Sequence, residues 1–468
     1  MTHIWNKYLV NGLFLTILLA FVISKSTHLD IPYFWDESWV YAPAVNVMAD
    51  LGPTLNPASF PLEHSRGHPL LFHFLGGSWI SIFGNSLTSL HAYALSISVL
   101  FISAIYIIIT RLISKLVALA SCALIIFQPI FYAQASMVLP EILLSFLCFL
   151  SFWTCYKRKW LSYFIFASLA IWTKESALAF IICLCGATIF RNFKHKWNIK
   201  EIILSALPIF SFVIFLVCNK LAFGWYLYPE HTGMLTLELS PFIGKLKAIF
   251  MNILVDQKRL PLTVSGLIAS VFLIIKDRSA FKSDLFIFLL VPTIGFSIFS
   301  ALNFYTVRYI LTIFPLVIIL ITWLVVEALK DRKIWLAILV IAIMTHSIIQ
   351  LFDKRSVRDI DLSYLDYGPT QLEVVKYMEA NQLYDESIHT SFLTSTALTQ
   401  KYGGYRNTDQ VFTRVNQGMD KEQNYFIFSK LEPHHHRDKV VGNPKSKLLK
   451  SYRKGNVSFQ IFLLEGSL

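Results

Sequence analysis

Charged residues are scarce in this sequence. Asp, Glu, Lys and Arg make up 15% of the 468 residues, whereas soluble globular domains carry about 25%. Hydrophobic residues make up 55%, and the mean hydropathy is +0.56. Apolar runs of about 20 residues recur, which is the length that a helix needs to cross the hydrocarbon core of a bilayer. The composition excludes a soluble globular protein and predicts an all-α polytopic membrane protein.

Paired cysteines are also lacking. All six cysteines lie in or at the ends of apolar segments, so they predict neither a disulfide framework nor a zinc site, and we interpret them as small packing residues. The run His434–His436 has no second cluster to complete a metal site. Internal repeats, a glycine-rich nucleotide loop and nuclease or protease motifs are absent from the sequence.

About 11–12 membrane spans are predicted. The first is interpreted as a retained span, because no convincing cleavage site follows it. The segment 69–84 either crosses the membrane or does not, because it is short, begins with proline and contains His73 and a glycine pair. The other predicted spans are 8–24, 89–110, 114–133, 138–155, 160–173, 175–190, 202–219, 261–276, 284–302, 309–328 and 334–351.

The basic short loops decide the orientation, because such loops prefer the cytoplasm. With a cytoplasmic N-terminus and 69–84 on the membrane surface, all of them face the cytoplasm; if 69–84 crosses, all of them face outside. The rule therefore favours a segment 69–84 that lies on the membrane surface or dips into the membrane and out again on the same side. The loops are 111–115, 156–160, 191–200, 276–282 and 330–333.

In this topology most of the unusual polar residues face the extracytoplasmic side. The transmembrane domain is predicted over 1–351, with its first extracytoplasmic loop at 25–88. The loop 220–260 is interpreted either as a mobile cover over the acceptor or as a structural surface loop. Residues 352–468 predict a small soluble α/β domain, with a helix in "TQLEVVKYMEANQ" and strands in "SIHTSF", "NYFIFSK" and "VSFQIFLLE".

Acidic residues on that side are candidates for acid–base chemistry. Asp36 and Glu37 are neighbours, and on a helix they point about 100° apart, so one of them faces a given substrate. Tyr41 shares a face with Glu37 by its spacing. Glu141 follows Pro140 at the start of a span. The alternatives are helix capping by Asp36 and a favourable interaction of Glu141 with the helix dipole.

Cationic residues on the same side are candidates for binding an anion. Arg66 and His68 flank a turn that begins a helix, where anions bind readily; the alternative is anchoring at the membrane surface. Lys174 interrupts a long apolar stretch, where it either holds a phosphate or pairs with Glu175 in a tight turn. Arg308 begins a span and either binds an anion or snorkels. The set suits a reaction between a membrane-bound phosphate and an acceptor hydroxyl.

Four segments together resemble the polyprenyl-phosphate-dependent glycosyltransferases of GT-C fold. "WDESWVYAPA" resembles the Asp-Glu loop after their first span, and "RGHPLL" resembles their basic-Pro-Pro-Leu segment. "WTKES" resembles their Thr-Lys-Gly turn, and "RYILTIFPL" their Arg-Tyr-Leu-x-x-x-x-Pro span. The chain is most similar to the family 39-like set: protein O-mannosyltransferases, lipid A aminoarabinose transferases and bacterial relatives that modify lipopolysaccharide. The resemblance covers residues 1–330 in order and spacing.

The resemblance implies an inverting transfer of a sugar from a polyprenyl monophosphate to a hydroxyl. Asp36 would be the general base, Glu37 would support it, and Glu141 would orient the base or the acceptor. The residues expected to bind the substrate or its phosphate are Tyr41, Arg66, His68, Lys174, Arg308 and Tyr309. The chain departs from the family pattern at His68, where Lys is more usual, at Glu141, where the family has Asp, and at Glu175, where it has Gly.

The expected partners are a polyprenyl-phosphate-linked sugar donor, the bilayer, and a glycan, lipid or protein acceptor. Nucleic acid is not expected, because the loops account for much of the net charge of +12. The sequence indicates no cofactor, and it neither indicates nor excludes the binding of a divalent metal ion. The predicted location is a bacterial inner membrane, with the site outside the cytoplasm. There are two alternative functions. One is a transporter or lipid flippase, which would carry inverted repeats and charges near mid-membrane. The other is a non-enzymatic assembly subunit, for which the Asp36 loop would be dispensable.

Overall fold

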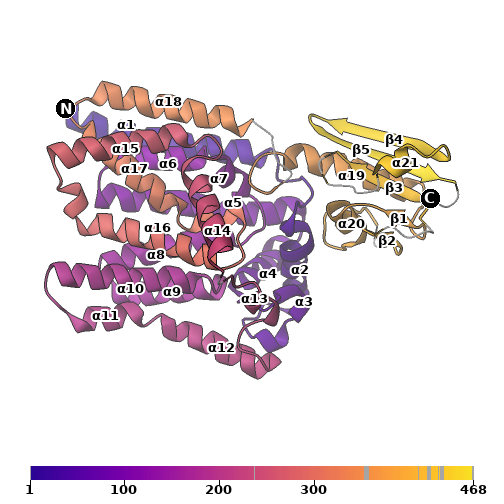
Figure 1. Cartoon of the computed structure of the whole chain (residues 1–468), viewed down its shortest axis with the longest axis horizontal. Coiled ribbons are helices and arrows are strands. Elements are labelled where there is room, and N and C mark those ends of the chain that lie inside the picture. The colour runs from indigo at the N-terminus through magenta and orange to yellow at the C-terminus, as the bar shows by residue number, and fades with distance from the viewer. Residues whose placement is uncertain are drawn as a thin grey trace.

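A helix bundle and a small sheet lie at opposite ends of the long axis of the molecule (Figure 1). The computed structural model describes residues 2–236, 238–352, 358–408, 410–418, 423–430, 432 and 437–465. The run His434–His436 lies outside the described residues. The N-terminus lies at the far end of the bundle from the sheet, so the chain crosses the whole molecule before it forms the C-terminal domain (Figure 1).

Each predicted span corresponds to one or two helices of the bundle. Within the described residues, six helical stretches are long and apolar enough to cross a membrane, and six shorter apolar helices accompany them. The multi-pass membrane protein predicted from the sequence is thereby confirmed. The bundle helices are α1 (Thr2–Ser26), α5 (Leu87–Leu112), α6 (Lys115–Ile126), α8 (Glu141–Tyr156), α9 (Trp160–Thr173), α10 (Ala177–Lys194), α11 (Ile199–Ala206), α12 (Ile209–Phe223), α15 (Leu260–Lys276), α16 (Asp284–Leu302), α17 (Phe314–Ala328) and α18 (Lys333–Leu351).

The outside of the bundle is apolar, the reverse of a soluble protein. Leu161, Leu221 and Ile275 are each at least 75% exposed. Side chains of this kind are stable in contact with lipid tails, where burial in a protein core is not needed. Proline interrupts two of the predicted spans: α7 (Pro129–Gln134) begins after α6, and Pro208 separates α11 from α12.

Short elements cluster at the end of the bundle beside the C-terminal domain (Figure 1). Among them, α4 covers the segment 69–84 and packs against α2. A Cβ on Gly76 would lie 2.7 Å from Val45, and one on Gly77 would lie 2.7 Å from Met48, so the glycine pair permits this close packing. These elements are η1 (Glu37–Tyr41), α2 (Ala42–Leu51), η2 (Pro57–Ser59), α3 (Leu62–Ser65) and α4 (Leu71–Phe83).

The interpretation of 220–260 as a loop is wrong for most of its length. After α12 ends at Phe223, the segment forms α13 (Pro229–Thr232) and α14 (Leu239–Leu254). Ile249 and Ile253 are buried one turn apart on α14, which explains why the segment is ordered as a helix. The 3-10 helices η3 (Ala280–Lys282) and η4 (Val307–Thr312) precede α16 and α17.

The C-terminal region forms the predicted α/β domain. Its five-stranded sheet has the order β2-β1-β3-β5-β4, with β1 parallel to β2 and β3, and with β5 antiparallel to β3 and β4. The predicted helix is α19, and the three predicted strands are β1, β3 and β5. The elements are α19 (Tyr364–Ala380), β1 (Ile388–His389), α20 (Phe392–Thr399), β2 (Val415–Asn416), β3 (Tyr425–Ser429), α21 (Arg437–Val441), β4 (Ser446–Lys454) and β5 (Val457–Leu464).

The chain returns to the bundle between α18 and α19. Lys25 donates a hydrogen bond from Nζ to the Tyr364 hydroxyl at 2.8 Å. Gln134 of α7 donates to the backbone carbonyl of Asp359 at 2.5 Å. These contacts bring an acidic segment from beyond the last span against the end of the bundle.

Candidate active site

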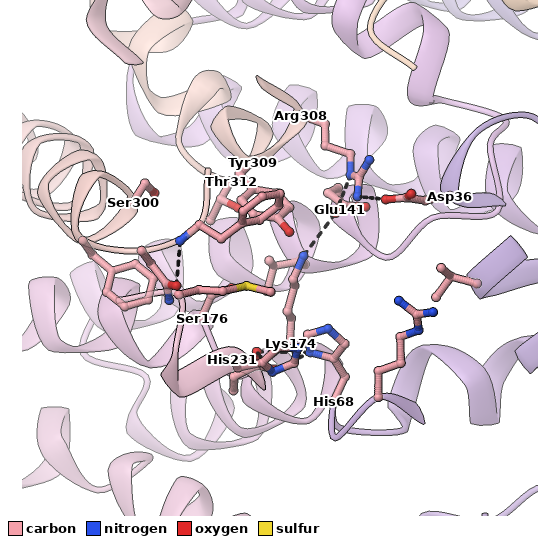
Figure 2. A pocket seen from close by; sticks show the side chains of 18 of the residues that line it. Asp36, His68, Glu141, Lys174, Ser176, His231, Ser300, Arg308, Tyr309 and Thr312 are labelled. Atoms are coloured by element: carbon pink, nitrogen blue, oxygen red, sulfur yellow. Dashed lines mark hydrogen bonds and ion pairs between the residues drawn. The ribbon is translucent and has the colours of Figure 1, made fainter. Parts of the chain in front are cut away.

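A cavity of about 340 Å³ lies where η1, the start of α8, the α9–α10 turn, α13 and η4 meet (Figure 2). These elements come from distant parts of the sequence, so only packing brings them together. Eight of the nine predicted site residues line the cavity: Asp36, Tyr41, Arg66, His68, Glu141, Lys174, Arg308 and Tyr309. The ninth, Glu37, does not.

Arg308 is the centre of the site. Its guanidinium is buried and donates from three nitrogens to three carboxylates. Nε donates to Glu141 at 3.1 Å, and Nη1 donates to Asp359 at 2.5 Å. Nη2 donates to Asp36 (Figure 2). One arginine therefore ties together the first loop, the start of α8 and the segment before the C-terminal domain.

Lys174 provides a second fixed cation. Its Nζ lies 3.2 Å from the same Glu141 oxygen that faces Arg308, and 4.0 Å from the centre of the Tyr309 ring. Burial by itself lowers the pKa of Lys174, but Tyr309 and Glu141 outweigh this effect and raise the pKa above its ordinary value. Lys174 is thus a cation that pairs with Glu141, and not with its neighbour Glu175 as the tight-turn alternative supposed.

Asp36 and Glu37 have different surroundings, as their angular separation on a helix predicts. Asp36 accepts a hydrogen bond from the Trp39 indole at 2.9 Å, and its side chain keeps 20% of its exposure. Glu37 keeps 2% and accepts the backbone N–H groups of Phe34 at 3.0 Å and Val138 at 2.7 Å.

Glu37 also pairs with an inner histidine of α5. One of its oxygens lies 2.9 Å from Nε2 of His91, whose Nδ1 faces the carbonyl of Leu29 at 2.8 Å. With these contacts Glu37 fixes the first loop against α5 and against the segment between α7 and α8. It holds Asp36 at the cavity, while its own side chain is absent from the cavity lining.

Arg66 is the least neutralised cation of the cavity. The structure places its guanidinium 4.0 Å from the centre of the Trp39 ring, and among the described residues no acidic side chain forms an ion pair with it. Arg66 and Gly67 both have positive φ, 48° and 71°, which turns the loop sharply after α3. A Cβ on Gly67 would lie 2.4 Å from Tyr228, so this glycine lets the segment before α13 pack closely over the turn.

His68 faces Glu175 instead of Lys174 or Arg308. Its Nδ1 lies 2.9 Å from one Glu175 oxygen. Burial would raise the pKa of Glu175, but the charge of His68 and its hydrogen bond lower it to about 2. His231 of α13 lies against the His68 ring, with 4.5 Å between ring centres. Burial, followed by the charge of His68, lowers the pKa of His231 to about 4.

Sequence reasoning missed two residues of this site. Asp359 lies beyond the last predicted span, outside the predicted transmembrane domain, and was therefore not among the candidate site residues. Burial raises the pKa of Asp359, and the pairing with Arg308 opposes that rise. His231 lies in the segment that was interpreted as a loop. A histidine one residue after an acid, Glu230, was the only signal of it in the sequence.

Comparison with known proteins identifies the fold. Neither a family model nor a curated protein sequence matches the chain. The crystal structure of ArnT from Cupriavidus metallidurans bound to undecaprenyl phosphate matches with a TM-score of 0.59 at 10% identity, over 96% of this chain and 98% of ArnT. Its apo structure matches with a TM-score of 0.60 at 10% identity, over the same shares. The predicted fold class, a GT-C type bundle with a small C-terminal domain, is confirmed.

Proposed function

We propose that the chain is an integral membrane glycosyltransferase that moves a sugar from a polyprenyl-phosphate donor to a hydroxyl. The observation that carries the proposal is the meeting of Asp36, Glu141, Lys174 and Arg308 in one cavity of an ArnT-like fold. ArnT itself has been crystallised with undecaprenyl phosphate bound, which supports a donor of this class.

The cations would hold the phosphate of the donor. Lys174 and Arg308 are fixed by Glu141, so they present charge without having to reorganise. Arg66 has no acidic partner among the described side chains and is the cation most available to a new anion. Stabilising the charge that develops on a leaving phosphate is often the largest catalytic contribution.

Asp36 would act as the general base. As the acceptor oxygen forms its bond to the anomeric carbon, Asp36 takes the hydroxyl proton. The bond from that carbon to the phosphate oxygen breaks, and its electron pair leaves on the phosphate. Attack opposite the leaving group inverts the anomeric configuration. Trp39 and Arg308 hold the carboxylate in place for this step.

The cavity would face the extracytoplasmic side of a bacterial inner membrane. The basic loops of the sequence support this orientation. The acceptor would be a hydroxyl of lipid A, a core oligosaccharide, another envelope glycan or a protein. A transporter or flippase would place its charges near mid-membrane, whereas Glu141, Lys174 and Arg308 lie at helix ends.

Replacing Asp36 by asparagine tests the proposal. A deletion strain would be complemented with the wild type, Asp36→Asn or Asp30→Asn, and its envelope glycans, lipids and proteins compared by mass spectrometry. Asp30 is an exposed acid of the same loop and serves as the control. We expect Asp36→Asn to leave the acceptor unmodified and Asp30→Asn to restore it, at equal amounts of protein in the membrane. Full restoration by Asp36→Asn would overturn the proposed base.

A further inference from the structure

Another cavity, of about 290 Å³, lies between α15, α17 and α18. Its lining residues differ entirely from those of the active-site cavity. It is formed near the point where α15 ends and α18 begins, and α18 begins at the end of the bundle away from the sheet (Figure 1). Its volume is near the lower limit of about 300 Å³ for ordinary ligand pockets. The bundle therefore has a space for a ligand that the active site does not use.

The interior of this cavity is apolar. Seven of its nine lining residues are apolar, among them Phe272 of α15 and Val325 of α17. The hydroxyl of Ser265, which also lines it, is already used, because it donates to the carbonyl of Leu262 at 2.7 Å. Ser265 and Phe272 are seven residues apart, so the lining extends about 10 Å along α15. An elongated apolar ligand fits such a space.

The charged residue of the lining is Arg332, which is exposed and immediately precedes α18. Its basic neighbours have acidic partners. Lys330 Nζ lies 2.8 Å from a Glu327 oxygen. Lys276 Nζ lies 4.0 Å from an Asp331 oxygen. Among the described residues no acidic side chain forms an ion pair with Arg332, so its charge is available to an anion beside the cavity.

The surroundings of Arg332 indicate a membrane surface with the hydrocarbon region beside it. Trp335, one turn after Arg332, is 64% exposed, and tryptophan is enriched where a membrane meets water. Ile268, in the cavity lining, is 65% exposed, as expected of a side chain in contact with lipid tails. The helix ends 276–278 and 327–333 together carry five basic and three acidic residues. The opening therefore lies beside a surface of net positive charge.

We propose that this cavity binds an acyl chain of an anionic phospholipid whose phosphate pairs with Arg332. The apolar interior matches the chain, and the exposed guanidinium matches the phosphate. Basic pockets between membrane helices are known to bind anionic lipid headgroups. A zwitterionic lipid would bring a positive group of its own to a surface that is already positive, so a headgroup of net negative charge is preferred.

A partner helix would fit this cavity less well than a lipid. An α-helix with its side chains is about 10–12 Å across, so it would cover the opening without filling the space behind it. A single hydrocarbon chain is thin enough to enter between the helices. Ile268 of α15 and Leu339 of α18 both line the cavity, so the chain would contact both helices and fill the space between them.

Photolabelling tests the proposal at this site alone. Phosphatidylglycerol with a photoreactive group in one acyl chain would be added to the full chain in detergent, and the labelled peptides identified by mass spectrometry. We expect labelling within 265–272 and 325–339. Unlabelled phosphatidylglycerol should compete, and phosphatidylcholine with the same acyl chains should compete much less. Arg332→Ala should raise the lipid concentration for half-maximal labelling by about 10-fold, because it removes a charged hydrogen bond.

Arg111→Ala is the matched control, because Arg111 is an exposed arginine in the last turn of α5 and lies outside the cavity lining. It should be labelled at the same lipid concentration as the wild type. A second variant, Ala328→Phe, keeps Arg332 but places a larger side chain in the lining. It should lose the labelling of 265–272 even at high lipid concentration.

Three results would overturn the site. The first is competition by phosphatidylcholine as strong as that by phosphatidylglycerol, and the second is labelling without enrichment in the two peptides. The third is the same half-maximal concentration in Arg332→Ala and Arg111→Ala. Size-exclusion profiles identify a variant that fails to fold, and competition in the wild type then decides alone. The labelled peptides lie outside the active site, so the outcome is independent of whether the chain transfers a sugar.

Discussion

Two buried arginines show how differently this protein uses the same side chain. Arg191 lies in the last turn of α10, and the α10–α11 connection is at the end of the bundle away from the sheet (Figure 1). It donates to Glu201 and to the Tyr156 carbonyl, both at 3.1 Å. Glu201 also pairs with Arg158. There, one carboxylate lies between two arginines; at the cavity, one arginine lies between three carboxylates.

Arg191 belongs to a structural ion pair, whereas Arg308 belongs to the candidate active site. Arg191 joins neighbouring segments, and the cavity lining does not include it. Arg308 lines the cavity and joins carboxylates from three distant segments. Breaking a buried pair is costly in either place, so burial and pairing alone do not identify function. Two features distinguish the arginines. Arg308 lines a cavity, and its three carboxylate partners come from three separate segments.

The strongest test of the comparison replaces each arginine by lysine. Arg308→Lys keeps the charge but cannot reach three carboxylates at once, so we expect transfer to fall about 100- to 1,000-fold. Arg191→Lys should keep the transfer rate per folded molecule within a few-fold while lowering the thermal midpoint. Initial rates and melting curves in the same detergent would measure both. Equal losses of transfer in the two variants would remove the distinction.

A second test compares Arg66, which lines the cavity, with Arg158, which pairs with Glu201 beside Arg191. Arg66→Ala removes the cation that has no acidic partner among the described residues. The KM for the polyprenyl-phosphate-linked donor should rise by about 10- to 100-fold, with a smaller change in kcat, because a charged hydrogen bond contributes about 1.5–3 kcal/mol. Arg158→Ala, on the structural pair, should leave the KM unchanged. A kcat loss without a KM change in Arg66→Ala would contradict the assignment to donor binding.

The smallest expected effect concerns pH and Asp359. Because the pKa of Asp359 is raised in the folded protein, the folded state holds this proton more tightly than the unfolded state does. Its contribution to stability is therefore complete below the ordinary pKa of an aspartate and is lost as pH rises through the folded value.

Asp359→Asn removes this titration. The thermal midpoint of the wild type, relative to that of Asp359→Asn, should increase as pH falls from neutral toward acid. Melting curves over that range would measure the difference. A difference that is constant with pH, or one that changes in the opposite direction, would contradict the raised pKa.

The fold was largely predictable because its signals are local. Long apolar runs predict membrane helices whatever their neighbours are, and the alternation in "VSFQIFLLE" predicts β5. The failures have a physical cause as well. The helix α14 is amphipathic and packs through a few residues such as Ile249 and Ile253, so it lacks the continuous apolar run that marks a span.

The site was predictable as a list of residues, but their contacts were not. Lys174 and Arg308 drew attention because charges beside spans are costly. Nothing local indicates that Glu141 would hold both of them, or that Asp359 would cross from beyond the last span to join Arg308. Asp36 and Glu37 carry the same kind of group, and only the fold assigns one to the cavity and the other to the interior.

The sequence by itself determined that this is a membrane protein with acids and cations at its helix ends, because transfer into lipid depends on the composition of each segment alone. The tertiary structure decided which of those charges meet, how the first loop turns, and that His231 lies beside His68. These are long-range contacts, and their energies depend on burial and distance between segments that the order of residues does not specify.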